Sequence, residues 1–209
     1  MDQTPREHVV SSIEALEQLY AAPAAASIVK EIDYLHPLYR KFIEAAPFAV
    51  LATGGPEGFD ASPRGDPAGF IVVEDEKTLL IPDRRGNNRI DSLRNLVRDP
   101  RCALLFFVPG VSETLRVNGR ATITIKPELL ERFAFERKLP RSVICVHVER
   151  VYFQCSRAIM RSQLWAVETQ IDRSSLPSIG TILEDLSRAQ IDGEKYDREL
   201  PDRLKSTLY

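Results

Sequence analysis

The chain has 209 residues, 44% of them apolar, and its 28 Lys and Arg nearly balance 30 Asp and Glu, for a formal net charge of −2. Such a chain is globular and long enough to bury a core, and its near-neutral charge argues against nucleic acid or an anionic membrane as a partner. Cys102, Cys145 and Cys155 form no CxxC pair and no apolar run approaches about 18 residues, so we expect no metal site, no disulfide framework and no transmembrane helix. Because no apolar leader segment is evident, we expect a cytoplasmic protein.

The N-terminal part of the sequence, residues 1–46, is predicted to be a helical arm. Apolar residues between Ile28 and Ala46 recur at the spacing of a helix. Pro37 lies within this run and is expected to kink the helix or divide it in two, because proline removes a backbone donor and clashes with the preceding turn.

After Pro47, short apolar or alternating runs are separated by turn residues. These runs predict strands at 48–53, 59–62, 70–73, 78–81, 102–108, 115–125 and 143–153. Helical spacing predicts helices at 90–98 and 126–138 and a further helix near the end of the sequence. Short strands joined mainly by turns indicate a mainly β fold, a small antiparallel β-barrel with peripheral helices.

Four stretches combine polar and charged residues in patterns that suggest a ligand site. The first, residues 60–70, places a hydroxyl, a guanidinium and two carboxylates in a turn with two prolines and two glycines. Gly65 allows a ligand to approach the backbone closely. The alternative is an ordinary hairpin turn with a surface ion pair between Arg64 and Asp66.

The second stretch, residues 82–89, places three arginines and two asparagines around Gly86, directly before the predicted helix at 90–98. Unpaired N–H groups and the positive end of the helix dipole favour an anion there, and guanidinium groups match the geometry of phosphate oxygens. This stretch is the best candidate for a phosphate site, with a solvated basic loop as the alternative. The glycine-rich patterns of a P-loop or a Rossmann site are missing from the sequence.

The third stretch, residues 109–121, leads from a Pro-Gly turn into a strand that carries Thr114, Arg116 and Asn118 on one face. These side chains either line a pocket or form the solvent face of an ordinary strand.

The fourth stretch, residues 153–165, holds the single tryptophan, Trp165, close to Arg161 and Ser162. A packing pair of tryptophan and arginine is the alternative to a binding role. Cys155 lies in the same stretch without a neighbouring histidine or thiol, so we expect it to be buried and structural.

Taken together, these stretches resemble the FMN-binding split-barrel proteins related to pyridoxamine 5'-phosphate oxidase. The segments that carry the resemblance lie in order over about residues 45–168 and read SPRGDPAGF (62–70), RRGNNR (84–89), NLVRDPRCALLF (95–106), PGVSETLRVNGRA (109–121) and CSRAIMRSQLW (155–165). The resemblance implies a six-stranded, antiparallel, Greek-key-like split barrel at 47–168 and a helical tail at 169–209 packed on that barrel. It also implies FMN as the cofactor, bound at the interface of a homodimer.

The resemblance also implies roles for particular residues. The strand that borders the isoalloxazine ring would contain Ser62, Arg64, Gly65 and Asp66. The grip on the phosphate and the ribityl chain would come from Arg84, Asn88 and Arg89. The strand positions that reach the flavin edge would be Thr114 and Arg116. The residues with which the partner subunit closes the pocket would be Arg161, Ser162 and Trp165.

The chain departs from the true oxidase in one respect. That enzyme carries an Arg-x-His substrate element near its C-terminus, whereas no histidine follows His147 here. We therefore expect an oxidoreductase that transfers hydride or electrons between FMN and a reduced nicotinamide or a small organic substrate, and not oxidation of pyridoxamine phosphate. The alternatives are a flavin carrier without turnover, a deazaflavin-binding module, and a dimer that has lost its ligand.

Overall fold

The computed structural model describes residues 8–209 and divides the chain into two compact units, with the boundary between Glu31 and Ile32. The first unit contains two short helices without buried residues, α1 (Ile13–Glu17) and α2 (Ala25–Val29). The first seven residues of the predicted arm lie outside the described residues. The division into an arm, a barrel and a tail at residues 46 and 168 stays a prediction.

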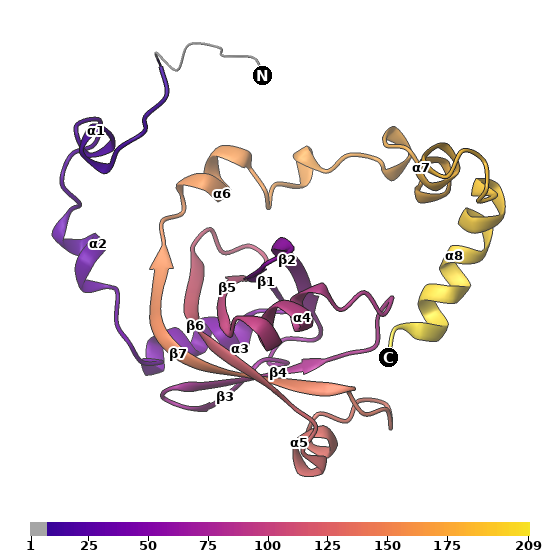
Figure 1. The fold of residues 1–209 in the computed structure, drawn as a ribbon, viewed down its shortest axis with the longest axis horizontal. Coiled ribbons are helices and arrows are strands. Elements are labelled where there is room, and N and C mark those ends of the chain that lie inside the picture. The colour runs from indigo at the N-terminus through magenta and orange to yellow at the C-terminus, as the bar shows by residue number, and fades with distance from the viewer. Residues whose placement is uncertain (1–7) are drawn as a thin grey trace. The chain divides into compact units, whose positions relative to one another are not determined.

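The second unit is built around an antiparallel sheet of seven strands (Figure 1). The strands are β1 (Phe48–Gly55), β2 (Gly58–Gly65), β3 (Val72–Asp75), β4 (Thr78–Asp83), β5 (Arg101–Phe107), β6 (Thr114–Thr124) and β7 (Ser142–Gln154). The α-helices of this unit are α3 (Pro37–Ala45), α4 (Asp91–Arg98), α5 (Pro127–Arg132), α6 (Arg157–Ser162), α7 (Ile179–Leu186) and α8 (Gly193–Thr207), with short 3-10 helices at Val167–Thr169 and Arg173–Ser175.

The strands follow one another across the sheet in the order β2-β1-β5-β6-β7-β4-β3, so that β2 and β3 form its edges. The longest ladder joins β6 to β7 and shifts its register between Asn118 and Gly119. A Cβ atom at Gly119 would collide with the carbonyl oxygen of His147 on β7. Glycine is therefore required where these two backbones approach each other.

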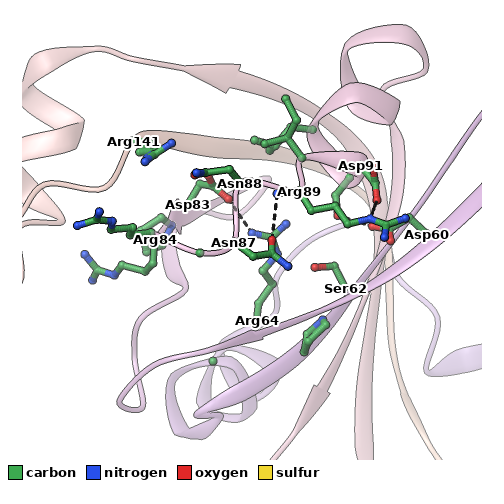
Figure 2. Close-up of a pocket in the computed structure, with 18 of the residues that line it drawn as sticks. Asp60, Ser62, Arg64, Asp83, Arg84, Asn87, Asn88, Arg89, Asp91 and Arg141 are labelled. Atoms are coloured by element: carbon green, nitrogen blue, oxygen red, sulfur yellow. Dashed lines mark hydrogen bonds and ion pairs between the residues drawn. The ribbon is translucent and has the colours of Figure 1, made fainter. Parts of the chain in front are cut away.

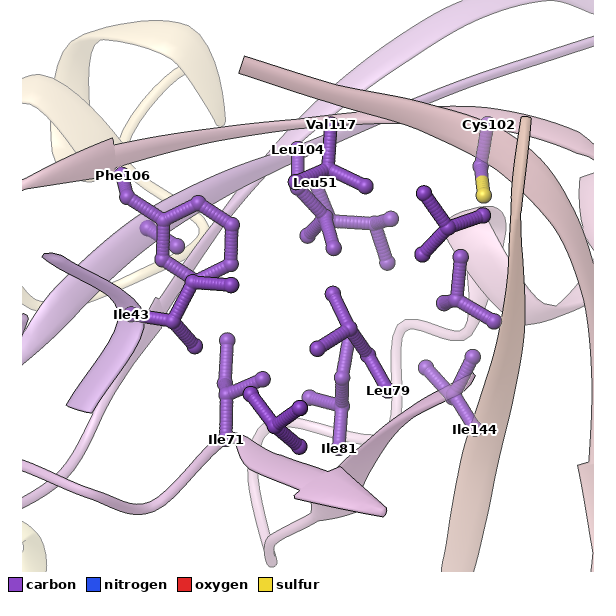
Figure 3. Close-up of a cluster of buried hydrophobic side chains, with 14 of the residues drawn as sticks. Ile43, Leu51, Ile71, Leu79, Ile81, Cys102, Leu104, Phe106, Val117 and Ile144 are labelled. Carbon is purple, nitrogen blue, oxygen red and sulfur yellow. The ribbon is translucent and has the colours of Figure 1, made fainter. Parts of the chain in front are cut away.

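One face of the sheet surrounds a hydrophobic core to which several strands and α3 contribute (Figure 3). Leu51 of β1 and Leu104 of β5 lie opposite each other in the ladder, and both are fully buried. Ile43 of α3 is also fully buried in this core. The intervening residues of β1 and β5 point to the other face, where Val50 and Leu105 remain partly exposed. Because successive side chains point to opposite faces, the second apolar face of β5 lies outside the core.

The predicted antiparallel, mainly β architecture is confirmed, with the seven strands that the sequence pattern predicts and not the six that the resemblance implies. Pro37 divides the predicted N-terminal helix, because it occupies the first turn of α3, where its missing N–H costs nothing. The predicted helix at 126–138 is too long: α5 ends at Arg132. Beyond it, Phe135 and Lys138 pair backbone to backbone, which stops the helix.

The tail contains the expected helices, and α7 and α8 pack against each other through glycines. The amide N–H of Gly180 donates to a carboxylate oxygen of Asp197 at 2.7 Å, and a side chain at Gly180 would collide with the backbone of Gly193. Packing of the tail on the barrel stays a prediction. Within residues 8–209, none of the helices combines the length and the apolar character needed to span a membrane.

Candidate functional site

A cavity of about 660 Å³ lies where β2, the end of β4 and the start of α4 come together (Figure 2). Its walls are formed by residues 60–65 and 82–93, together with Phe70, Arg141, Leu208 and Tyr209. The charged side chains among these residues are five arginines and three aspartates, namely Arg64, Arg84, Arg85, Arg89, Arg141, Asp60, Asp83 and Asp91. The excess of positive charge makes the cavity suited to an anionic ligand.

Arg64 lies near the middle of the cavity and is held by Asp83 (Figure 2). Its Nη1 donates to Oδ1 of Asp83 at 2.7 Å, and the two side chains are only 17% and 14% exposed. The Nε–H of Arg64 is buried and has no acceptor among the described residues. Because an unsatisfied buried donor is costly, Arg64 is ready to donate to a polar ligand atom.

Arg84 forms the second arginine–aspartate pair at the cavity. Its Nε donates to Oδ2 of Asp66 at 2.7 Å, and its Nη1 donates to the carbonyl oxygen of Phe133 at 2.5 Å. The Asp66 side chain is 2% exposed. A charged pair with this little exposure is stable only when its hydrogen bonds are made, so Arg84 has a fixed orientation.

The N-terminus of α4 opens into the cavity at residues 90–93. Ile90 is the N-cap residue, and it gives the first N–H groups of the helix no side-chain acceptor. Just before it, Asn88 adopts a left-handed backbone with φ of 64°. Arg89 forms an ion pair with Asp91 at 2.5 Å, and this bond raises the pKa of the Arg89 guanidinium. Unsatisfied N–H groups and arginine together form the kind of site that binds phosphate.

Two further arginines of the cavity have no ion-pair partner among the described residues. Arg85 follows Arg84 directly, and Arg141 comes from the segment before β7. Figure 2 shows Arg141 on the same side of the cavity as Arg84, whereas Arg89 lies on the opposite side with Asp60 and Asp91. Positive charge is therefore present at both ends of the cavity.

Residues 35–155, more than half of the chain, match the pyridoxamine 5'-phosphate oxidase family. The chain belongs to this family. The matched residues include α3 and all seven strands of the sheet, as well as most of the residues that line the cavity. None of the curated protein sequences compared with the chain matches it.

Solved structures with related folds match over roughly half of the chain or somewhat more. HupZ of Group A Streptococcus is 18% identical with a TM-score of 0.45, and the match covers 55% of this chain and 89% of HupZ. A candidate pyridoxamine 5'-phosphate oxidase from Lactobacillus delbrueckii is 18% identical with a TM-score of 0.46, covering 58% and 95% of the two chains. An FMN-binding protein from Syntrophomonas wolfei is 11% identical with a TM-score of 0.43, covering 68% and 97%. These likenesses are partial, and no further conclusion rests on them.

Six of the twelve residues that the resemblance assigns to a flavin site come together at this cavity. The lining residues among them are Ser62, Arg64, Gly65, Arg84, Asn88 and Arg89. Asp66 lies directly behind the wall, where it binds Arg84. The structure thus brings together the first and second of the four stretches, from β2 and from the β4–α4 connection.

The residues of the third stretch lie outside the cavity. Thr114 is buried opposite Gln154 in the ladder between β6 and β7. Arg116 donates to the Tyr152 hydroxyl at 3.1 Å, and its guanidinium lies 5.6 Å from the centre of the Tyr152 ring. Their predicted contact with a flavin edge therefore stays a prediction.

The residues of the fourth stretch also lie apart from the cavity of their own chain. The indole Nε1–H of Trp165 donates to the carbonyl oxygen of Val111 at 2.8 Å, and the Ser162 hydroxyl donates to the carbonyl oxygen of Ile159 at 3.1 Å. Arg161 is exposed at the end of α6. The predicted contact of Arg161, Ser162 and Trp165 with the flavin of a partner subunit stays a prediction.

Several lining residues escaped sequence reasoning. Asp83 stands inside the arginine-rich stretch, where it could have been recognised as the partner of one arginine; Arg85 is one of the three arginines noted there, but it was given no role of its own. Arg141 and Tyr209 lie 52 or more residues beyond Arg89 in the sequence, outside any polar motif. Only the folded chain brings such distant residues to one cavity.

Proposed function

We propose that the chain is a flavoprotein that binds FMN in this cavity and transfers hydride or electrons between FMN and a reduced nicotinamide or a small organic substrate. The observation that carries the proposal is the arginine-lined cavity at the start of α4, which lies largely within the residues that match the family. Oxidation of pyridoxamine phosphate is not proposed, because no histidine follows His147 in the sequence.

The residues of the cavity fit the chemical groups of FMN. The phosphate suits the open N–H groups of α4 together with Asn88 and Arg89. The buried and unsatisfied Nε–H of Arg64 suits a polar atom at the edge of the isoalloxazine ring. Gly65 exposes its backbone at the cavity without a side chain in the way.

When bound, FMN supplies hydride or electron transfer, which no side chain of the protein supplies itself. The residues of the chain would hold and orient it. Arg64, fixed by Asp83, would hold a guanidinium near the ring and stabilise negative charge there. Arg84, fixed by Asp66, would add positive charge from the neighbouring wall, beside its expected hold on the phosphate and the ribityl chain.

We further propose that the functional unit is a homodimer with the cavity near the subunit interface. The outer face of β1 and β5 carries apolar side chains that remain partly exposed, among them Phe48, Val50, Leu105 and Phe107. The rings of Phe48 and Phe107 lie 6.1 Å apart on this face. A contiguous apolar patch of this kind is typical of a surface that another subunit covers. In such a dimer, Arg161, Ser162 and Trp165 would reach the cavity of the partner.

We also propose that the protein is located in a reducing compartment such as the cytoplasm. Cys102, Cys145 and Cys155 are all free thiols. Thiols that are not paired persist where the cell keeps them reduced.

The visible spectrum of the freshly purified protein tests flavin binding. We expect a yellow protein with stoichiometric FMN, or a colourless protein that takes up added FMN with micromolar or tighter affinity. Mixing with NADH or NADPH in a stopped-flow instrument then tests turnover, with dithionite as the chemical control for reducible flavin. Reduction by neither nucleotide would favour a flavin carrier. Stronger binding of a deazaflavin than of FMN would assign the cavity to that cofactor, and a protein that binds neither would reject the proposal.

A further inference from the structure

The cavity has one wall that comes from outside the part of the chain matched by the family. Among the described residues that line the cavity, only Leu208 and Tyr209 lie beyond residue 155. They follow α8, more than 50 residues after the last strand of the sheet. The segment that matches the family therefore does not form this side of the cavity, and the end of the tail forms it.

Tyr209 is attached to this wall by its hydroxyl and by its ring. The hydroxyl donates to Oδ1 of Asp66 at 2.8 Å. The ring lies 4.4 Å from the ring of Phe135, centre to centre, with an angle of 36° between the planes. The hydrogen bond to Asp66 raises the pKa of the Tyr209 phenol, so the phenol keeps the proton that it donates at neutral pH.

The same contacts connect Tyr209 to Arg84. Asp66 accepts from Tyr209 with one carboxylate oxygen and from Arg84 with the other. The Arg84 guanidinium also lies 5.9 Å from the centre of the Tyr209 ring and 5.8 Å from that of Phe135. One buried carboxylate therefore positions both a cationic and an aromatic group on the wall of the cavity.

The attachment of Tyr209 is local. The helix that precedes it, α8, packs mainly against α7, and most of its residues are exposed. The anchor, in contrast, is rigid, because Asp66 is almost fully buried and is held by Arg84. Tyr209 can therefore leave the wall and return to it without unfolding of the barrel, since segments with few buried contacts open most easily.

We propose that Tyr209 is a ligand-contacting wall of the cavity, held in place by Asp66, which closes the side next to Arg84 and retains a bound ligand with a planar aromatic ring. This inference rests on the proposed function, in which that ligand is FMN. An aromatic ring that packs at the edge of a cavity shields one side of such a ligand from water. Removal of the ring opens this side and shortens the lifetime of the complex.

The test is the rate at which FMN leaves the protein, measured by stopped-flow fluorescence after dilution into an excess of a competing apoflavoprotein. We expect Tyr209→Ala to release FMN at least about tenfold faster than the wild type. Tyr209→Phe keeps the ring and loses the hydrogen bond to Asp66, so its rate should lie in between. The matched control is Tyr196→Ala on α8, where the ring packs on Arg203 at 4.2 Å and does not line the cavity. This variant should release FMN like the wild type.

An unchanged release rate in Tyr209→Ala, or an equal acceleration in Tyr196→Ala, overturns the inference. If the wild type binds no FMN, the proposed function fails, and amide hydrogen exchange then decides on Tyr209. Faster exchange around Phe133–Phe135 and at residues 208–209 of Tyr209→Phe, relative to the wild type and to the Tyr196→Ala control, supports a closing wall. Unchanged exchange in both segments rejects it.

Discussion

Arg64 of β2 donates to Asp83 of β4 at 2.7 Å, although four other strands separate β2 from β4 in the sheet. The sheet therefore curls until two strands without a shared ladder meet through their side chains. A second pair, Arg84 with Asp66, joins the residues that directly follow the same two strands. The cavity lies at this junction, so the ion pairs that close the fold also border the proposed binding site.

Replacement of Arg64 tests the contribution of this junction to stability. Arg64→Ala leaves the Asp83 carboxylate partly buried without its partner, so the free energy of unfolding should fall by about 1–3 kcal/mol. Urea unfolding followed by circular dichroism measures the change. The matched control is Arg101→Ala, which removes an arginine that is 75% exposed and paired with Asp99. Surface pairs contribute little, so an equal loss in both variants would contradict a special role for the junction.

Replacement of Arg89 tests where the phosphate binds. Riboflavin and FMN differ only by the phosphate, so the pair of ligands isolates this group. We expect Arg89→Ala to weaken FMN binding by at least about tenfold and to leave riboflavin binding unchanged, as measured by quenching of flavin fluorescence. Arg98→Ala, which removes an arginine paired with Glu57 outside the cavity, should leave both affinities unchanged. Equal weakening of both ligands by Arg89→Ala would place the phosphate elsewhere.

The hydrophobic pattern predicted all seven strands, although β3 begins two residues later than expected and β2 ends three residues later. Strands such as β5 and β7 are continuous apolar or alternating runs that begin and end within one residue of their predicted bounds. The start of α4 was also predicted within one residue, because apolar residues at helical spacing begin directly after the arginine-rich loop. These elements depend mainly on local sequence. For the same reason, the sequence also identified the residues of β2 and of the β4–α4 connection that line the cavity.

Other features depend on contacts that local sequence does not encode. The helix expected at 126–138 stops at Arg132, because the following residues form a turn in which Phe135 pairs with Lys138. Tyr209 reaches the cavity only through Asp66, which precedes it by 143 residues. No periodicity or motif signals such a contact. The sequence therefore predicted the cavity walls formed by β2 and by the β4–α4 connection. It did not predict the wall formed by Leu208 and Tyr209.

Replacement of Leu105 tests the proposed dimer. Leu105 lies on the outer face of β5, whereas the adjacent Leu104 is fully buried in the core. Leu105→Glu places a charge on the apolar face and should convert a dimer into folded monomers, because an unpaired charge is costly at an interface. Sedimentation velocity measures the mass, and far-UV circular dichroism confirms the fold. Thr122→Glu, an exposed position on β6, is the control and should stay dimeric. A wild-type monomer would contradict the proposed dimer, and a dimer that tolerates Leu105→Glu would place the interface on another surface.

The buried thiol of Cys102 leads to a prediction about the stability of the protein at alkaline pH. Burial, with a smaller contribution from the charge of Glu149, raises the pKa of Cys102 to about 12, against an ordinary value of 9.0. Above pH 9 the unfolded chain loses this proton while the folded chain keeps it. The unfolded state then binds fewer protons, so stability falls as the pH rises from about 9 to 12. The slope from this one group reaches at most about 1.4 kcal/mol per pH unit.

The Cys102→Ala variant should therefore lose stability less steeply than the wild type between pH 9 and 11, even if the missing thiol makes it less stable at pH 7. The slope of the unfolding free energy against pH separates the two effects, because the loss of packing shifts the whole curve and leaves its slope unchanged. Cys155→Ala is the control, since Cys155 is exposed, and not buried as the sequence suggested, and this variant keeps the buried thiol of Cys102. The same burial should make Cys102 unreactive toward thiol reagents in the native protein, whereas Cys155 reacts at once. Rapid labelling of Cys102 in the native state, or equal slopes in the wild type and Cys102→Ala, would mean that this part of the core opens to water.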